Sequence, residues 1–255
     1  MKKIIAIITV LIFTNCSTEK NQAQTQKFNT EAISKFWEIT AYLKRDHTLN
    51  DMLWNSYYNL KGNKNYIEHN RSKESAIDHR KFLELVFRSS LSDSLQKVIR
   101  SKKYKNNDIF QNLIYIKNNE KALKKYTKTI TSSAYFKECI ALSKKFLPKG
   151  KYQKIPKDLV IYIQAFTYDA AVQENSMYFG LSVVHDFDKL QKGAVAAHEF
   201  HHILRQNKEF KNSLSVKDSA SYSMINQINN EGIADLIDKE IIAKYPKKNT
   251  NGNNV

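Results

Sequence analysis

The sequence predicts a predominantly helical α+β fold, with a helical N-terminal half followed by a small antiparallel sheet and two more helices. Between Met1 and Leu147 there is no proline and only one glycine, Gly62, so little in this half interrupts a helix. Beyond it, two apolar runs rich in β-branched and aromatic residues, Leu159–Phe166 and Met177–Val184, are typical of strands. The second half is therefore expected to contain, in order, two strands and two helices.

Apolar residues in the N-terminal half recur at intervals of three and four, the spacing of a buried helix face. Examples are Ile33, Phe36 and Trp37, and later Phe82, Leu83, Val86 and Phe87. Polar stretches at 50–51, 61–65 and 105–108 predict short turns between several helices. The aromatic side chains of this half are expected to form a packed core, with a substrate groove as the alternative.

The second half begins at the predicted boundary Pro148-Lys149-Gly150. Its two apolar runs are separated by about ten residues, which favours an antiparallel pair. Asp186 or Asp188 is expected to cap a helix over Lys189–Asn207. A last helix is expected over Ser219–Lys244, with its apolar residues mostly buried.

The N-terminus has the features of an export signal. Lys2 and Lys3 precede the apolar run Ile4–Phe13, which is shorter than the roughly 20 residues that span a bilayer. Cys16 follows closely and resembles the lipobox cysteine of bacterial lipoproteins, although Asn15 stands where a small residue is usual. This resemblance implies an exported cell-envelope lipoprotein, on the periplasmic or outer-surface side of a bacterial membrane and anchored by a lipid on Cys16. The alternative is an ordinary secretory signal that is cleaved a few residues later.

The chain is strongly basic, with 41 Lys and Arg against 25 Asp and Glu and a formal net charge of +16. Such a charge often indicates a nucleic-acid partner. The lysine runs contain no recognisable nucleic-acid motif, however, so no nucleic-acid partner is expected. The lysines are expected on solvated helix faces, close to anionic lipid near the anchor. With Cys16 lipidated, Cys139 has no disulfide partner and is expected to be a small buried residue.

The first of the two C-terminal helices contains the pentapeptide His198-Glu199-Phe200-His201-His202, an H-E-x-x-H pattern. Residues four apart share a helix face, so His198 and His202 can direct two imidazoles at one point. Imidazole nitrogen suits Zn²⁺, which in catalytic sites takes three protein ligands and leaves a position for water. Glu199 lies about 100° further round the helix and can reach that water. A solvated, histidine-rich helix face is the alternative.

The last helix supplies a candidate for the third ligand in the stretch Asn230-Glu231-Gly232-Ile233-Ala234-Asp235. Twenty-eight residues separate His202 from Glu231, enough for the chain to turn and return alongside the first helix. Glu231 is therefore expected to complete a site of two histidines and one glutamate. Asp235, one turn further on, is expected to accept the second ring N–H of a ligand histidine.

The order H-E-x-x-H followed by N-E-x-x-x-D resembles the gluzincin clan of zinc metallopeptidases, the thermolysin-like group. More narrowly it resembles uncharacterised bacterial zinc-dependent peptidases that are often lipoproteins with a helical N-terminal half. The resemblance covers about Leu159 to Ile242. It implies a gluzincin-like fold with two zinc-site helices and one Zn²⁺ per chain. Transferred by motif position, the roles are metal ligand for His198, His202 and Glu231, general base for Glu199, and hydrogen-bond partner of His198 for Asp235.

The resemblance also implies an activity, the hydrolysis of peptide bonds in a peptide or protein substrate by metal-activated water. Gluzincins bind extended substrates on the edge of a strand, which here would be Met177–Val184. His201 occupies a variable motif position and is expected on the helix surface. The five predicted regions are a lipoprotein signal segment (1–16), a polar tether (17–27), a helical N-terminal region (28–147), a zinc peptidase core (151–245) and a disordered tail (246–255).

Two alternatives to an active peptidase remain open. Gluzincins usually supply a Tyr or His from beyond the third ligand to stabilise the oxyanion, and only 24 residues follow Glu231 here. Tyr222, Tyr178 and His185 are the candidate substitutes, each with a structural role as the simpler explanation. A zinc-binding lipoprotein that presents its groove to a peptide or partner without catalysis is therefore the second hypothesis. A helical envelope protein without metal is the third.

Overall fold

The computed structural model describes residues 27–70, 73–205 and 215–244. The predicted signal segment with Cys16, most of the tether and the predicted tail lie outside the described residues. The strands are β1 Lys27–Asn29, β2 Val160–Gln164, β3 Ala170–Gln173 and β4 Ser176–Gly180. The helices are α1 Glu31–Leu43, α2 Asp51–Tyr58, α3 Lys61–Asn70, α4 Lys73–Phe87, the 3₁₀ turn η1 Ser89–Leu91, α5 Ser92–Arg100, α6 Asp108–Asn118, α7 Glu120–Ile130, α8 Ser133–Lys144, α9 Leu181–Asp188, α10 Ala194–Leu204 and α11 Val216–Lys244. The predominantly helical α+β class is confirmed.

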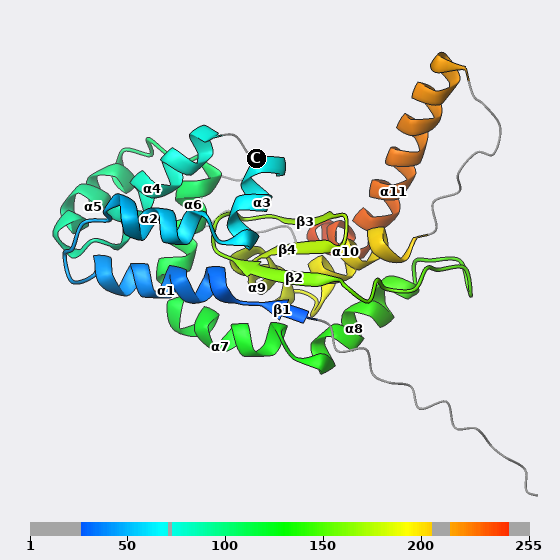
Figure 1. Cartoon of the computed structure of the whole chain (residues 1–255), viewed down its shortest axis with the longest axis horizontal. Helices are drawn as coiled ribbons and strands as arrows, with labels where there is room; N and C mark the ends of the chain where they lie inside the picture. Colours follow the sequence, from blue (N-terminus) through cyan, green and yellow to red (C-terminus); the bar gives the residue numbers. More distant parts are fainter. Residues whose placement is uncertain (1–26, 71–72, 206–214, 245–255) are drawn as a thin grey trace, which may run out of the picture.

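The sheet has the strand order β1-β2-β4-β3 (Figure 1). Strands β1, β2 and β4 run parallel, and β3 pairs antiparallel with β4 at the edge. The predicted antiparallel pairing of the two apolar runs is wrong, because Ile161 of β2 lies opposite Met177 of β4 in a parallel register. The intervening residues account for the difference: β3 crosses to the far side of β4 and returns through a turn at Glu174, whose φ is 48°. The short run of β3 gave too weak a strand pattern to be predicted.

The second predicted strand is also shorter than expected, since Leu181–Asp188 forms α9. The chain changes from strand β4 to helix α9 at Gly180. Only glycine fits there, because a Cβ would lie 2.3 Å from the carbonyl oxygen of Thr167. Leu181 and Val184 are fully buried. A short apolar run buried in this way looks the same in sequence whether it is strand or helix.

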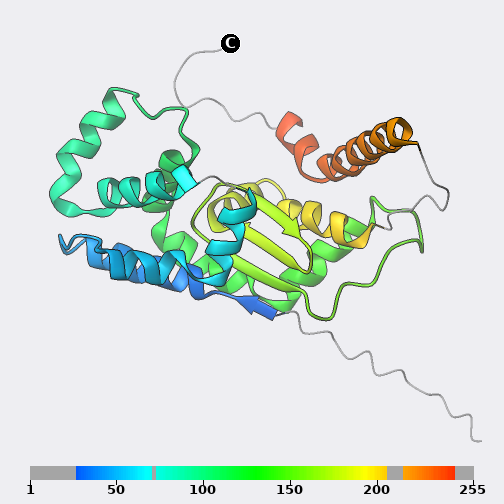
Figure 2. The same cartoon turned by 45° about the horizontal axis from the view of Figure 1, so that its top comes forward.

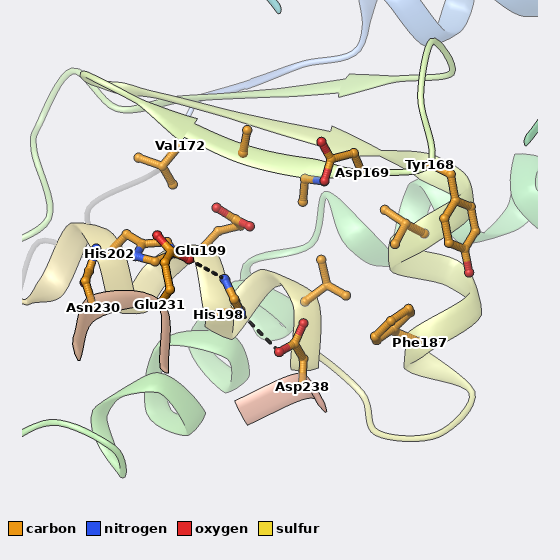
Figure 3. A pocket seen from close by; sticks show the side chains of 14 residues that line it. Tyr168, Asp169, Val172, Phe187, His198, Glu199, His202, Asn230, Glu231 and Asp238 are labelled. Carbon is orange, nitrogen blue, oxygen red and sulfur yellow. Dashed lines mark hydrogen bonds and ion pairs between the residues drawn. The ribbon is translucent and has the colours of Figure 1, made fainter. Parts of the chain in front are cut away.

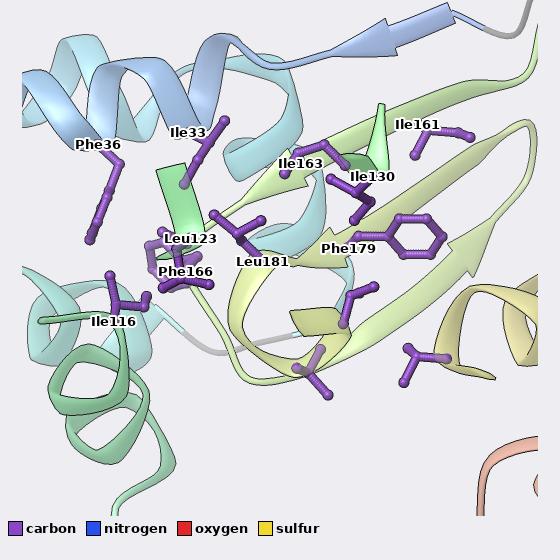
Figure 4. Packing of buried hydrophobic residues seen from close by; sticks show 14 of the residues in the cluster. Ile33, Phe36, Ile116, Leu123, Ile130, Ile161, Ile163, Phe166, Phe179 and Leu181 are labelled. Carbon is purple, nitrogen blue, oxygen red and sulfur yellow. The ribbon is translucent and has the colours of Figure 1, made fainter. Parts of the chain in front are cut away.

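The two predicted halves share one hydrophobic core. Ile33 of α1 and Leu123 of α7 belong to the same buried cluster as Ile163 of β2 and Phe179 of β4 (Figure 4). The sheet's other face carries Tyr162 and Tyr178, which pack with Tyr66 of α3. Strand β1 pairs with β2, so residues from the start of the described chain belong to the same sheet as the C-terminal half. The regions on either side of residues 148–150 therefore contribute to one hydrophobic core.

The helix α10 begins later than predicted, at Ala194, and ends at Leu204. Asp186 and Asp188 belong to the last turn of α9, so neither is the N-cap residue of α10. That position is occupied by Gly193. Asp188 still fixes the start of α10, because its Oδ1 accepts a hydrogen bond of 2.8 Å from the Gly193 N–H. Gly193 has φ 80°, and a Cβ there would lie 2.9 Å from the Sγ of Cys139. Cys139 is buried, as predicted.

The last helix, α11, lies against α10, and much of it is exposed. Figures 1 and 2 show its N-terminal part projecting from the body of the molecule. Ala234 and Ile237 are buried, whereas Ile228 and Leu236 are 58% and 51% exposed. The prediction that its apolar residues are mostly buried is wrong, because only one face has a helix to pack against. Within the described residues, no helix combines the length and apolar character that a membrane span requires.

Candidate metal centre

The two histidines of the H-E-x-x-H pattern lie side by side on one face of α10. Their ring centroids are 4.9 Å apart, and both side chains are largely buried. The α10 helix brings them together through its one-turn spacing, as the sequence predicted. Figure 3 shows both rings facing the cavity that lies between α10, α11 and β3.

Glu231 reaches this pair from α11. Its Oε2 lies 3.8 Å from His198 Nε2 and 3.5 Å from His202 Nε2. Two ligand atoms about 2.0–2.1 Å from one tetrahedral metal lie roughly 3.4 Å apart. The three donors all lie within 4.8 Å of one another. The two Glu231 distances are therefore close to the separation that tetrahedral zinc requires. Two imidazoles with one carboxylate are donors of the kind that catalytic zinc takes.

The second ring nitrogen of His198 contacts Asp238, a residue that the sequence analysis missed. Nδ1 donates a 3.1 Å hydrogen bond to Asp238 Oδ1, whereas Asp235 Oδ1, the predicted acceptor, lies 3.9 Å away. With the proton on Nδ1, the Nε2 lone pair faces Glu231 and is available to a metal. Asp238 follows Glu231 by seven residues, two helical turns, so the spacing along α11 could have identified it.

Glu199 lies in the same cavity and is 6% exposed. Burial raises the pKa of its carboxyl to about 8, the adjacent His198 opposes this, and the carboxylates of Asp169, Glu231 and Asp238 raise it further. Burial therefore favours the protonated form of Glu199. A cation held by His198, His202 and Glu231 would favour its ionised form.

His201 does not lie on the helix surface, so that prediction is wrong. Its side chain is 0% exposed and faces away from the metal ligands, toward a separate cavity of about 470 Å³ that Phe146 and Leu147 also line. Burial lowers the pKa of His201 to about 4, so the ring is neutral near pH 7. The physical reason is that α8 and α11 both pack on α10 and cover its other faces.

The cavity at the candidate centre has a volume of about 610 Å³, within the size range of small-ligand and peptide sites. It is lined by residues of β3, α9, α10 and α11 and by the segment that precedes β3. Its charged side chains are the carboxylates of Asp169, Glu199, Glu231 and Asp238, and no Lys or Arg is among the described residues that line it.

The three residues considered for oxyanion stabilisation lie elsewhere. Tyr178 is buried on the other face of the sheet, stacked on Tyr162 with centroids 5.3 Å apart. His185 Nδ1 lies 2.8 Å from the hydroxyl of Tyr115, and Tyr222 lines the second cavity. Of the described residues that line the candidate site, none is one of these three.

Comparison with known proteins identifies a family. A family model described as "Putative zinc dependent peptidase (DUF5700)" matches residues 54–253, well over half of the chain. The match includes both helices of the candidate centre and most of the helical N-terminal half. Neither the curated proteins nor the solved structures gave a match.

Proposed function

The chain belongs to the family described as "Putative zinc dependent peptidase (DUF5700)", and we propose that it hydrolyses peptide bonds at the centre formed by His198, His202, Glu231 and Glu199. The observation that carries the proposal is the convergence of two Nε2 atoms and one carboxylate oxygen beside a buried glutamate, at the wall of a cavity. The order of these residues along the chain resembles that of gluzincins, and we propose that the protein is a peptidase of that clan.

In this proposal His198, His202 and Glu231 hold one Zn²⁺. When bound, zinc activates a water molecule and polarises the carbonyl of the substrate. The carboxylate of Glu199 accepts a proton from a water molecule in the cavity and donates it to the amine that leaves. Burial raises the pKa of Glu199 and a bound cation would lower it, so the carboxyl can both accept and return the proton. Asp238 holds the His198 ring in the tautomer that leaves Nε2 free to bind the metal.

We further propose that a peptide binds along β3. The strand predicted for this purpose, now β4, has β2 on one side and β3 on the other, so its backbone groups are already paired. Strand β3 is the last in the sheet order, and Ala170, Ala171 and Val172 line the cavity. An extended peptide added to this edge would be held over Glu199 by main-chain hydrogen bonds.

A second candidate function is zinc-dependent peptide binding without hydrolysis. It is favoured by the position of Tyr178, His185 and Tyr222, none of which is among the described residues lining the cavity. Under either function we place the protein at the cell envelope, as a lipoprotein anchored through Cys16. The support for that location is the N-terminal sequence alone.

The test is zinc content together with digestion of a peptide library. We expect about one zinc per chain in the wild type and in Glu199→Gln, because Glu199 is not a ligand. Cleavage should fall by about 10²–10⁴-fold in Glu199→Gln and remain in Glu38→Gln, a control on the exposed face of α1. Zinc binding without cleavage by the wild type would favour the second function. Cleavage that persists in Glu199→Gln would contradict the assigned proton-transfer role.

A further inference from the structure

Asp169 stands apart from the other carboxylates of the cavity. Glu231 contacts both histidines, Asp238 bonds to His198, and Glu199 lies buried beside them. The Asp169 side chain is exposed, lies where the chain enters β3, and lines the cavity from the strand side (Figure 3). The metal centre therefore leaves this carboxylate free to meet a substrate.

The Asp169 carboxylate is held in one orientation. The hydroxyl of Tyr66, which is 0% exposed, donates a 2.9 Å hydrogen bond to Oδ2, and the Ala170 N–H donates one of 2.9 Å to Oδ1. The Asp169 carbonyl accepts a 2.9 Å bond from the Gly180 N–H, which fixes the backbone against β4. An ionised carboxylate can accept about four hydrogen bonds, so capacity remains for a ligand. A group fixed in advance loses little conformational entropy on binding.

The surroundings of Asp169 suit a cation with an apolar stem. Tyr168, Val183, Phe187 and Val195 line the same cavity. Figure 3 shows Tyr168 and Phe187 toward the Asp169 end and His202 toward the other. Lysine and arginine side chains pack their methylene stems on apolar surfaces and keep the charged head at a polar group. A basic side chain can therefore rest on this apolar wall with its charge at Asp169.

The net charge of the protein makes this local environment distinctive. The whole chain carries a formal net charge of +16, which disfavours the approach of a cationic peptide overall. In the cavity the described charged side chains are all acidic. The four carboxylates outnumber the two positive charges of one bound zinc, so the cavity still attracts a cationic group.

We propose that the site selects peptides that present a cationic group, and that Asp169 is the residue that binds this group. This inference rests on the proposed function and specifies its substrate class. The cation has two possible sources, a Lys or Arg side chain and the α-ammonium of a free N-terminus. Both present N–H donors to a carboxylate.

The experiment uses the zinc-loaded full chain and a peptide series based on one fixed sequence, chosen as a cleaved one where the library digest gives it and otherwise as a bound one. Each position carries lysine or norleucine, which share the stem and differ in charge, and each peptide has a free or acetylated N-terminus. We expect a cationic peptide to exceed its neutral counterpart in kcat/KM by about fivefold to tenfold, with the preference decreasing as salt increases. The acetylated lysine peptides identify a side-chain cation, and the norleucine peptides with a free amine identify the α-ammonium.

Asp169→Asn is the decisive variant, because asparagine has nearly the same shape and removes the charge. Its carbonyl oxygen can accept one of the two local hydrogen bonds, and its amide nitrogen can donate to the Tyr66 hydroxyl in place of the other. We expect it to reduce the cation preference to about one, and Tyr66→Phe to reduce it in part. Asp93→Asn, an exposed aspartate in the first turn of α5, should retain the wild-type preference. An equal preference in wild type and Asp169→Asn, or none in the wild type, overturns the proposal.

Binding of the same peptides to zinc-loaded Glu199→Gln, followed by fluorescence anisotropy, separates this inference from the proposed function. Charge-dependent binding that needs Asp169, without cleavage by the wild type, supports the inference and contradicts the peptidase. Cleavage without charge preference supports the peptidase and contradicts the inference about Asp169. A series in which no peptide binds or is cleaved contradicts both.

Discussion

At the scale of single residues, Asp238 is the group that orients His198. Its hydrogen bond to Nδ1 presents Nε2 to the metal position, and partners of this kind typically contribute 10–100-fold to metal affinity. We expect Asp238→Asn to weaken zinc binding by about that factor, because an amide is a poorer acceptor and cannot compensate charge. Asp235→Asn, whose Oδ1 lies 3.9 Å from the same nitrogen, should have a smaller effect. Competition with a chromophoric chelator measures both, and a larger loss in Asp235→Asn would reverse the assignment.

The buried ring of His79 should make the free energy of unfolding depend on pH. Its ring is 0% exposed and stacks on Phe166 with centroids 4.1 Å apart. Burial lowers the pKa of His79 to about 3, whereas an unfolded histidine titrates near 6.5. Between these values the unfolded chain binds a proton that the native protein does not. This contribution to the free energy of unfolding therefore falls by about 1.4 kcal/mol per pH unit as the pH decreases from 6.5.

Replacing His79 with Phe keeps an aromatic ring against Phe166 and removes this titration. We expect the wild type to lose about 2 kcal/mol more than His79→Phe between pH 7 and pH 5. Urea unfolding of both proteins at the two pH values measures the difference. Identical losses would show that His79 is protonated in the native state or exposed to solvent.

The residues of the candidate centre differ in how far the sequence identifies them. His198, His202 and Glu231 follow from helical spacing and residue chemistry, and the structure brings all three together. Asp238 was missed because Asp235 is closer to Glu231 along the sequence and also offers a carboxylate on the same helix. Which of the two reaches His198 depends on how α11 is rotated against α10. The burial of His201 depends on α8, which packs on α10 from a distant part of the sequence. Such tertiary packing leaves no local pattern.

At the scale of elements, the start of α10 depends on Gly193. Its φ of 80° is unfavourable for a residue with a Cβ, and that Cβ would also approach Cys139 Sγ to 2.9 Å. Gly150 has a similar φ of 73° with nothing within 4 Å of its Cβ position, so it isolates the backbone effect. We expect Gly150→Ala to cost about 1 kcal/mol and Gly193→Ala about 1–3 kcal/mol more, because the second must also displace α8.

Urea denaturation of the two alanine variants gives the comparison directly. Equal costs would mean that the contact between Gly193 and Cys139 relaxes freely. A shift in zinc affinity for Gly193→Ala alone would further show that the start of α10 positions His198, five residues later.

The helices were more predictable than the sheet, for a physical reason. Helices such as α1 and α4 can be predicted from the local sequence, because apolar residues recur in them every three or four positions. The order of strands is decided by which edges meet in three dimensions. The crossing of β3 to the outside of β4 depends on the close approach of Gly180 to the 167–169 backbone, which no hydrophobic pattern encodes.

At the scale of the whole molecule, the proposed metal joins α11 to the rest of the chain. Glu231 is the ligand that α11 contributes, and much of α11 is exposed, so few buried contacts hold it in the apo-protein. Zinc binds the native state through ligands that the unfolded chain does not bring together, and it therefore stabilises the fold. The stabilisation reaches about 2.7 kcal/mol when free zinc is 100 times the dissociation constant.

We therefore expect removal of zinc with a chelator to lower Tm and to speed hydrogen exchange in α11 more than in α1 or α4. Glu231→Ala should lose most of the zinc-dependent rise in Tm, because two histidines alone bind zinc weakly. Glu38→Ala, which removes an exposed carboxylate of α1, should keep it. Differential scanning fluorimetry with and without zinc, combined with exchange measured by mass spectrometry, gives both quantities. A rise in Tm that persists in Glu231→Ala would place the metal elsewhere, and uniform exchange on chelation would show that α11 is held to α10 by packing alone.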